Sequence, residues 1–133
     1  METGNKKEHP HGGQAVIQTA RQYIDAGLCA LPASREKKFP IRQVGKWSRF
    51  KKRMPTAMEL EAWFANGPDA ICLICGQASA NLEVIDFDHG AKLFDAWREK
   101  VDPDLFSHLV IETTQSGGKH VLYRCENEVC GNQ

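Results

Sequence analysis

The chain has 133 residues and a formal net charge of zero at pH 7, with 41% hydrophobic and 26% charged residues, a composition that excludes a disordered chain. The length fits one domain, and the longest apolar run, residues 70–75, is far shorter than the roughly 20 residues that a membrane-spanning helix needs. The N-terminus lacks the apolar segment of a signal peptide, so we expect a cytoplasmic protein.

The first part of the chain predicts a lead-in, a helix, a strand and a loop. Residues 1–13 are polar and contain glycine and proline, so we expect a flexible lead-in to one domain over residues 14–133. Apolar residues at helical spacing predict a helix over 14–26, which Gly27 ends. A short strand over 28–33 follows, and the segment after it shows no periodicity.

That segment carries a strong positive charge. Residues 35–53 hold nine basic residues against Glu36 alone, whereas residues 54–133 hold five basic residues against thirteen acidic ones. With Phe39, Trp47 and Phe50 interleaved, this pattern is typical of a surface that binds phosphates and stacks bases. The alternative is a solvated loop whose charges only keep the protein soluble. The residues that we expect to bind nucleic acid are Lys38, Arg42, Lys46, Trp47, Lys51 and Lys52.

The second part of the chain mixes helices and strands. Thr56 and Glu59 form a capping-box pattern that begins a helix. The strands predicted after it span residues 70–75, 82–88, 108–114 and 120–125, with a helix over 91–101 that Pro103 ends. Helices between groups of strands predict an α+β (α/β) fold, in which a mixed, largely antiparallel sheet is packed by helices.

The five cysteines allow two interpretations. Cys72 and Cys75 have zinc-ligand spacing, and Cys125 with Cys130 could complete a set of four thiolates. The first pair, however, lies inside an apolar run without a turn. We therefore expect reduced thiols buried in strands rather than a zinc site.

Two carboxylates stand at the end of the strand predicted over 82–88. Because strand side chains alternate between faces, Asp86 and Asp88 point the same way, while Ile85 and Phe87 point the other way. Two carboxylates at one place repel each other unless a cation lies between them, and hard oxygen ligands suit Mg²⁺ or Mn²⁺. The alternative is a polar turn that only caps the strand.

The connection between the last two strands contains two glycines and a lysine. In a hairpin turn over residues 115–119, backbone N–H groups of Ser116, Gly117 and Gly118 would be free to face an anion, with Lys119 and His120 beside them. The segment therefore predicts a phosphate-binding turn. The alternative is a plain hairpin with an incidental lysine.

Taken together, these stretches resemble the primase-polymerase domain at the N-terminus of phage and plasmid replication proteins, in the archaeo-eukaryotic primase superfamily. The resemblance runs from about Ala15 to the end and rests on an ordered set of short motifs. The set comprises Tyr23-Ile-Asp-Ala-Gly27 before Leu31-Pro32, Lys38-Phe-Pro40 before Trp47, Thr56 and Trp63, Gly76 with Ser79, Val84-Ile-Asp-Phe-Asp88 and Ser116-Gly-Gly-Lys-His120.

The resemblance implies metal-dependent nucleotidyl transfer from nucleoside triphosphates on a single-stranded DNA template. It implies that Asp86, Asp88 and His120 are catalytic and that the two aspartates hold Mg²⁺ or Mn²⁺. It also implies nucleotide binding by the turn and its flank, and a helicase within the same full-length protein. The nucleotide-binding residues would be Ser116, Gly117, Gly118, Lys119 and His120.

The family has a third acid further along the chain, for which we find no match before Gln133. Two aspartates alone hold a pair of metal ions poorly, so we expect a piece of a longer replication protein that binds nucleotide weakly. Two other functions stay open. One is a non-catalytic nucleic-acid-binding module that uses the basic segment, and the other is a metal-dependent nuclease.

Overall fold

The computed structural model describes residues 11–37 and 40–130, without the side chains of 11–13. By its internal contacts the chain divides into two compact units, an N-terminal unit over Met1–Ile74 and a C-terminal unit over Cys75–Gln133. The length predicted one domain over 14–133, and the structure builds that stretch from two units. None of the helices in the described ranges is long and apolar enough to cross a membrane.

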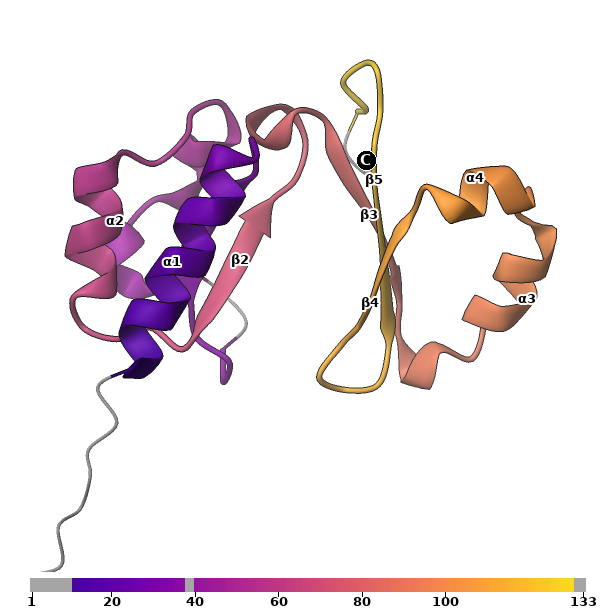
Figure 1. Cartoon of the computed structure of the whole chain (residues 1–133), viewed down its shortest axis with the longest axis horizontal. Helices are drawn as coiled ribbons and strands as arrows, with labels where there is room; N and C mark the ends of the chain where they lie inside the picture. The colour runs from indigo at the N-terminus through magenta and orange to yellow at the C-terminus, as the bar shows by residue number, and fades with distance from the viewer. Residues whose placement is uncertain (1–10, 38–39, 131–133) are drawn as a thin grey trace, which may run out of the picture. The chain divides into compact units, whose positions relative to one another are not determined.

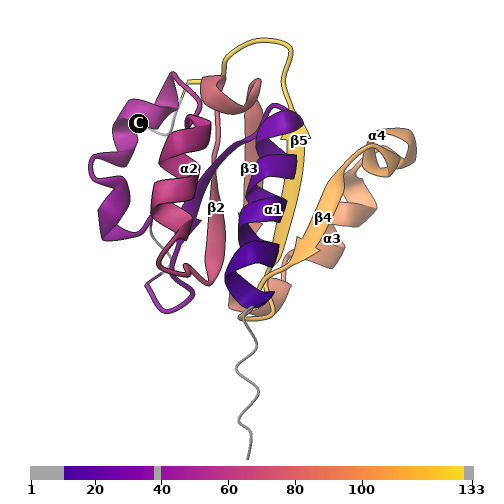
Figure 2. The ribbon, with the colours of Figure 1, turned by 60° about the vertical axis from the view of Figure 1, so that its left-hand side comes forward.

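The N-terminal unit packs two helices on a two-stranded sheet. Its elements are α1 (His11–Asp25), β1 (Cys29–Ala33), α2 (Ala57–Phe64) and β2 (Ala70–Ile74). The strands are antiparallel, with Cys29 opposite Ile74 and Ala33 opposite Ala70. Helices α1 and α2 contact β1 and each other (Figures 1 and 2). Helix α1 begins three residues earlier than predicted, inside the expected lead-in.

The basic segment enters the core of this unit at two points. It forms two short 3₁₀ helices, η1 (Arg42–Val44) and η2 (Trp47–Lys51), which bury Val44 and Phe50. The Phe50 ring meets Trp63 of α2 edge to face, with ring centroids 5.4 Å apart. The segment is therefore held by apolar anchors even though most of its residues are exposed.

Helix α2 begins as its sequence predicts. Thr56 is the N-cap, and its hydroxyl accepts a hydrogen bond from the Glu59 backbone N–H at 3.1 Å. The Glu59 carboxylate in turn accepts from the Thr56 N–H at 2.8 Å. Both halves of the capping box are thus present, and two of the N–H groups that a helix start leaves unpaired are satisfied.

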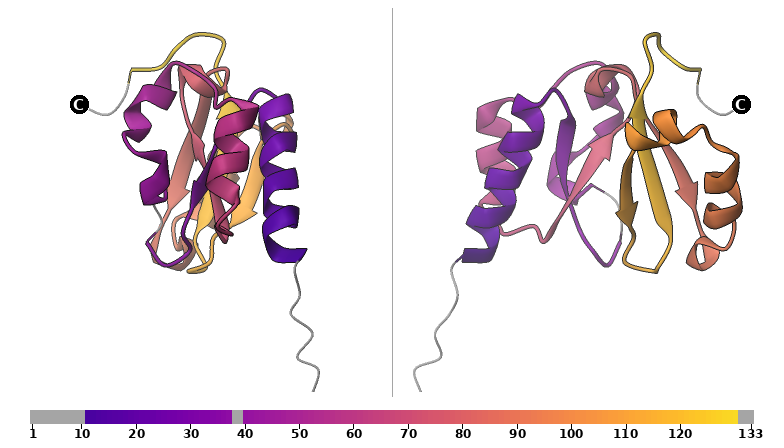
Figure 3. Two further views of the ribbon diagram at one scale, coloured as in Figure 1. Left: turned by 90° about the vertical axis from the view of Figure 1, so that its left-hand side faces the viewer. Right: turned by 45° about the vertical axis from the view of Figure 1, so that its right-hand side comes forward.

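The C-terminal unit contains a three-stranded antiparallel sheet in the order β3-β5-β4. The strands are β3 (Leu82–Phe87), β4 (Val110–Thr113) and β5 (Lys119–Arg124), and a short turn joins β4 to β5 (Figure 3). The 3₁₀ turn η3 (Gln77–Ser79) precedes β3. Helices with two small antiparallel sheets confirm the predicted α+β fold class, although the strands form two sheets rather than one.

Within the C-terminal unit, two short helices pack on the sheet through aromatic side chains. They are α3 (Phe94–Lys100) and α4 (Pro103–Ser107). Phe87 of β3 lies 5.5 Å from Phe94 and 5.2 Å from Trp97 between ring centroids, and Trp97 lies 6.3 Å from Phe106 of α4. These rings cover the face of the sheet to which Phe87 points, and leave the opposite face to Asp86 and His120.

The region after β3 differs from the prediction in two ways. The 3₁₀ turn η4 (His89–Ala91) precedes α3, so the helix is shorter than the predicted 91–101. Pro103 does more than end α3, because it is the first residue of α4. The Asp102 side chain caps α4 by accepting hydrogen bonds from the next backbone N–H groups, and proline suits the first helical position because its missing N–H needs no partner there.

Candidate functional site

The register of the three-stranded sheet brings Asp86 and His120 together. Asp86 on β3 is directly opposite His120 on β5, and His120 is directly opposite Glu112 on β4. Directly paired residues point to the same face, so the three side chains form a row across the sheet. His120 Nε2 lies 3.4 Å from Asp86 Oδ1, and His120 Nδ1 lies 3.9 Å from Glu112 Oε2. We refer to these three residues as the acidic row.

Asp88 extends this group beyond the end of β3. Its backbone is still extended, with φ −79° and ψ −176°, so its side chain leaves on the same side as that of Asp86. The next three residues all have positive φ: 55° at His89, 68° at Gly90 and 59° at Ala91. This left-handed turn is costly for His89 and Ala91, and it redirects the chain just after Asp88.

The donor set fits a divalent cation in part. Asp86 and Asp88 are both exposed, and within the described ranges Asp88 has no ion-pair partner. No group of three or more histidine, cysteine, aspartate or glutamate side chains in those ranges is disposed to hold a metal ion. Two carboxylates suit Mg²⁺ or Mn²⁺, which keep several water ligands and bind substrate phosphates, better than they suit a closed structural metal.

The turn between β4 and β5 is a three-residue hairpin loop. Its closing bonds run from the Thr114 N–H to the Gly118 carbonyl at 2.9 Å and from the Gly117 N–H to the Thr114 carbonyl at 3.0 Å. Gly117 has φ +85°, as the left-handed position of such a loop requires. The Gly118 N–H donates to Thr114 Oγ1 at 2.9 Å. We refer to residues 114–118 as the glycine turn.

These bonds correct the prediction of three free donors in the glycine turn. The N–H groups of Gly117 and Gly118 are used within the turn, so Ser116 alone of the three keeps an N–H without a partner among the described residues. The Ser116 hydroxyl lies 3.3 Å from Thr114 Oγ1 and is exposed. One N–H and one hydroxyl are therefore the donors that the turn offers to an anion.

Gly118 sets the distance between the glycine turn and β3. A Cβ atom at this position would lie 2.5 Å from the Phe87 carbonyl oxygen, which is closer than such atoms approach. Gly118 is buried and its φ is not in the left-handed region, so close approach rather than conformation requires glycine here. The turn can thus touch the strand end that carries Asp88.

Lys119 lies on the other face of the sheet from His120. The two residues are adjacent in β5, so their side chains point in opposite directions. Lys119 Nζ donates to Thr113 Oγ1 at 2.6 Å and lies 5.9 Å from the centroid of Phe94. The structure therefore brings Asp86 and His120 together and places Lys119 with the aromatic cluster.

Some cations of the basic segment are held by internal hydrogen bonds, and others have no ion-pair partner among the described residues. Arg53 makes two hydrogen bonds to the Glu59 carboxylate, at 2.9 and 2.6 Å, and its guanidinium lies 4.5 Å from the Phe50 centroid. Arg49 donates to the Val44 carbonyl at 2.8 Å. Four residues predicted to bind nucleic acid are exposed without ion-pair partners in the described ranges, and Lys38 lies outside those ranges. The four are Arg42, Lys46, Lys51 and Lys52.

Of the three aromatic residues predicted as stacking surfaces, Trp47 fits that role. Its exposed fraction is 39%, and Lys51 Nζ lies 5.4 Å from its ring centroid. Phe50 is fully buried against Trp63, so the prediction for Phe50 is wrong. Phe39 lies outside the described residues.

Two of the cysteines are strand thiols, Cys29 on β1 and Cys72 on β2. Cys29 is buried and Cys72 half-buried, and Cys72 Sγ donates to the Leu31 carbonyl at 3.6 Å. Burial raises the pKa of both thiols to about 11, which keeps them neutral and poor metal ligands at ordinary pH. This confirms the predicted strand thiol at Cys72, whereas Cys75 is exposed and follows the end of β2, so the prediction of a buried strand thiol is wrong at Cys75.

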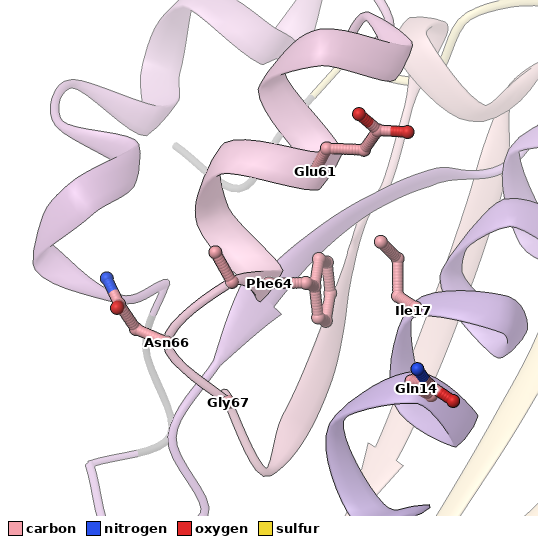
Figure 4. A pocket seen from close by; sticks show the side chains of 7 residues that line it. Gln14, Ile17, Glu61, Phe64, Asn66 and Gly67 are labelled. Carbon is pink, nitrogen blue, oxygen red and sulfur yellow. The ribbon is translucent and has the colours of Figure 1, made fainter.

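An open hollow lies between α1 and α2 in the N-terminal unit (Figure 4). Ile17 and Phe64 form its apolar part, and Gln14, Glu61 and Asn66 give it a polar rim. Glu61 is already paired with Arg21, at 3.2 Å between Oε1 and Nη2. None of the residues predicted to act on nucleotide or nucleic acid lines this hollow.

Comparison with protein families identifies the chain. A family model described as the N-terminal domain of bifunctional DNA primase/polymerase, Prim-Pol, matches residues 20–132. The chain belongs to the Prim-Pol family. The match spans both units and includes the acidic row, the glycine turn and the basic segment, and it confirms the resemblance derived from the short motifs. A comparison with curated proteins found no match.

Sequence reasoning missed Glu112. The signal was present, because a hairpin closed over residues 114–118 pairs residue 113 with 119, and hence Glu112 with His120. Counting outward from the turn would have placed the glutamate beside the histidine. The residue was overlooked because it lies in a strand of otherwise ordinary composition.

Proposed function

We propose that this Prim-Pol chain carries part of the machinery for nucleotidyl transfer from nucleoside triphosphates on a single-stranded DNA template. The observation that supports this most is the pairing of Asp86 with His120 across adjacent strands, 3.4 Å apart, beside the glycine turn. A carboxylate that suits a metal ion and an imidazole that suits a phosphate thus share one sheet face. That face is opposite to the one covered by aromatic side chains.

Asp86 and Asp88 are the residues that would hold Mg²⁺ or Mn²⁺. When bound, such an ion acts as a Lewis acid, which polarises phosphoryl oxygens and stabilises the negative charge that develops on them during transfer. Both carboxylates are exposed and point to the same side of the strand, so an ion can reach both from solvent. Remaining positions in the shell would be taken by water and by the triphosphate.

His120 and Ser116 are the residues that would hold the triphosphate. His120 Nε2 already lies against a negative group, Asp86, so a phosphate oxygen near the same place would meet a suitable donor. The hydroxyl and N–H of Ser116 add two donors. In the reaction a 3′-hydroxyl oxygen bonds to the α-phosphorus while the bond to pyrophosphate breaks, and the hydroxyl proton passes to water. Fixed donors stabilise the negative charge on the departing pyrophosphate.

The basic segment of the N-terminal unit would bind the template. Its exposed lysines offer charge to successive phosphates, and Trp47 offers a ring on which a base can stack. Arg49 and Arg53 are held by internal hydrogen bonds and would contribute less. The proposal therefore assigns template binding to Arg42, Lys46, Trp47, Lys51 and Lys52, with Lys38 as a further candidate.

A primer-synthesis assay tests this function. The chain is incubated with single-stranded DNA, nucleoside triphosphates and Mn²⁺, alongside Asp86→Asn and the matched control Glu99→Gln, which changes an exposed acid on α3. Because two aspartates alone hold a pair of metal ions poorly, we expect at most a low yield of extension products, which Asp86→Asn abolishes and Glu99→Gln retains. Metal-dependent cleavage of the DNA without added triphosphates would instead identify a nuclease and would contradict the proposal.

A further inference from the structure

The Thr114 hydroxyl has no part in the function proposed above, although it lies between two polar groups of the glycine turn. It accepts a hydrogen bond from the Gly118 N–H at 2.9 Å, and it lies 3.3 Å from the Ser116 hydroxyl. We propose that Thr114 is a positioning residue, whose hydroxyl orients that of Ser116 so that Ser116 donates its proton to a phosphate oxygen. This inference rests on the proposed binding of triphosphate by Ser116.

The hydrogen-bonding capacity of a hydroxyl gives these two contacts a direction. A hydroxyl group has one proton to donate and two lone pairs that accept. The Gly118 N–H occupies one lone pair of Thr114 Oγ1, so the Thr114 proton remains to be donated. The Ser116 oxygen, 3.3 Å away, can receive that proton.

A phosphate oxygen at Ser116 would fix the direction of the second contact. Without an anion, either hydroxyl can donate to the other. An ionised phosphate oxygen only accepts, so Ser116 turns its own proton toward the phosphate, and the bond between the two hydroxyls then runs from Thr114 to Ser116. The 3.3 Å separation is longer than the roughly 2.8 Å of a typical O–H···O bond, and we expect it to shorten when a phosphate orders Ser116.

The result is a series of hydrogen bonds from the Gly118 N–H through the hydroxyls of Thr114 and Ser116 to the phosphate, which we refer to as the hydroxyl relay. Each bond in such a series polarises the next and strengthens it. The Gly118 N–H, which is used within the glycine turn, would therefore still act on the anion through the two hydroxyls.

The glycine turn holds the Thr114 hydroxyl in place. The Thr114 N–H and carbonyl both close the turn, through bonds of 2.9 Å and 3.0 Å to Gly118 and Gly117. A Cβ atom on residue 118 would lie 3.0 Å from Thr114 Oγ1, so glycine leaves room for the hydroxyl to approach the Gly118 N–H. The branched side chain of threonine also limits rotation about χ1. Ser116 is exposed, and so its hydroxyl depends on Thr114 for its orientation.

A double-mutant cycle on triphosphate binding tests this inference. A non-hydrolysable nucleoside triphosphate with Mg²⁺ is titrated into the chain by calorimetry. We expect Ser116→Ala to weaken binding about tenfold and Thr114→Val about threefold to tenfold, while Thr114→Ser, which keeps the hydroxyl, stays within about twofold. In the Ser116→Ala chain, Thr114→Val should cause no further loss, because its effect passes through the Ser116 hydroxyl. Losses that simply add, as a general disturbance of the turn would produce, would overturn the inference.

The matched control is Thr113→Val. It makes the same chemical change one residue earlier, where the hydroxyl accepts a hydrogen bond from Lys119 Nζ on the other face of the sheet. Triphosphate affinity should not change. A loss as large as that of Thr114→Val would assign the effect to strand β4 as a whole and would contradict a specific role of Thr114.

The second test follows the Gly118 N–H by ¹H–¹⁵N NMR, because a structural role of Thr114 would not connect this proton to the ligand. Adding the triphosphate with Mg²⁺ should move the Gly118 proton signal downfield, and Ser116→Ala should abolish that movement, since polarisation no longer passes along the hydroxyl relay. If triphosphate binds and the signal moves equally in the Ser116→Ala chain, the inference alone is wrong. If no form of the chain binds triphosphate, the proposed function is wrong and the inference falls with it.

Discussion

Gly118 controls how closely the glycine turn approaches the end of β3. A methyl group added to Gly118 would lie 2.5 Å from the Phe87 carbonyl oxygen, which belongs to backbone that cannot swing away. We predict that Gly118→Ala pushes the glycine turn away from β3. The free energy of unfolding should fall by about 1–3 kcal/mol, which is the usual cost of overpacking in a protein core. Urea unfolding followed by circular dichroism measures the change.

Gly117 provides the matched control for this prediction. It has φ +85° but nothing within 4 Å of an added Cβ, so substitution there costs only the backbone conformation. Gly117→Ala should cost about 1 kcal/mol, and Gly117→Asn less, because asparagine tolerates the left-handed region. Equal stability of Gly118→Ala and the natural chain would show that the turn does not depend on this close approach.

At the residue scale, the sequence predicted to which side of a strand each side chain points, because strand side chains alternate between faces. It placed Asp86 and Asp88 on one side and identified His120 as their partner. It did not predict which donors of the glycine turn are already used, because those bonds depend on the Thr114 hydroxyl and the closed loop. Lys119 was grouped with His120 through nearness in sequence, although adjacent strand residues face opposite ways.

Helix α2 depends on the pairing of Glu59 with Arg53 and Thr56. The hydrogen bonds from Arg53, aided by the one from the Thr56 N–H, lower the pKa of Glu59 from 4.5 to about 2. Because the folded-state pKa is the lower one, this stabilisation is present above pH 4.5 and is lost as the pH falls toward 2. The cap therefore weakens in acid.

We predict that Glu59→Gln lowers the free energy of unfolding at pH 7 by about 1 kcal/mol, through loss of the charged partner in an exposed capping box. The difference from the natural chain should shrink as the pH is lowered from 4.5 toward 2. Glu61→Gln is the control, because the Glu61 side chain is 68% exposed in its pair with Arg21. Denaturant unfolding at several pH values measures both, and a difference independent of pH would contradict the assignment.

At the element scale, the long and strongly patterned segments were predictable. The capping box located α2, and continuous apolarity located β2. Helix α4 was missed because Pro103 was interpreted only as the end of α3, although Asp102 before Pro103 is also a helix-start pattern. The two 3₁₀ helices of the basic segment were missed because they are too short to show a period and are fixed by burial of Val44 and Phe50.

Charge is unevenly distributed over the whole molecule. The segment 35–53 has nine basic residues and one acidic, and the residues after it have thirteen acidic and five basic. Sequence predicted this asymmetry, but it could not say that Arg49 and Arg53 are engaged internally or that Phe50 is buried. It also gave no sign that the chain divides into two units, since each has an ordinary composition.

We predict that single-stranded DNA binds through the basic segment with marked salt dependence. Lys51→Gln with Lys52→Gln should lower the slope of log affinity against log salt by about one for each phosphate that the variant no longer neutralises. Trp47→Ala should weaken binding by about 1–3 kcal/mol without changing the slope, because stacking releases no ions. Fluorescence anisotropy at several salt concentrations measures both effects.

The matched control for these substitutions changes lysines outside the basic segment. Lys92→Gln with Lys100→Gln removes the same charge from the C-terminal unit. Binding should then change little. If this pair reduced the salt slope as much as the Lys51 and Lys52 pair, net charge rather than the basic segment would explain the binding.

The most direct measurement of the central claim is calorimetric titration of the chain with a non-hydrolysable nucleoside triphosphate, with and without Mn²⁺. We predict binding that requires the ion and that Asp86→Asn or Asp88→Asn weakens at least tenfold, while Asp95→Asn on α3 leaves it unchanged. Binding of equal strength without divalent ion, or in the Asp86→Asn chain, would contradict a shared metal and nucleotide site on this face of the sheet.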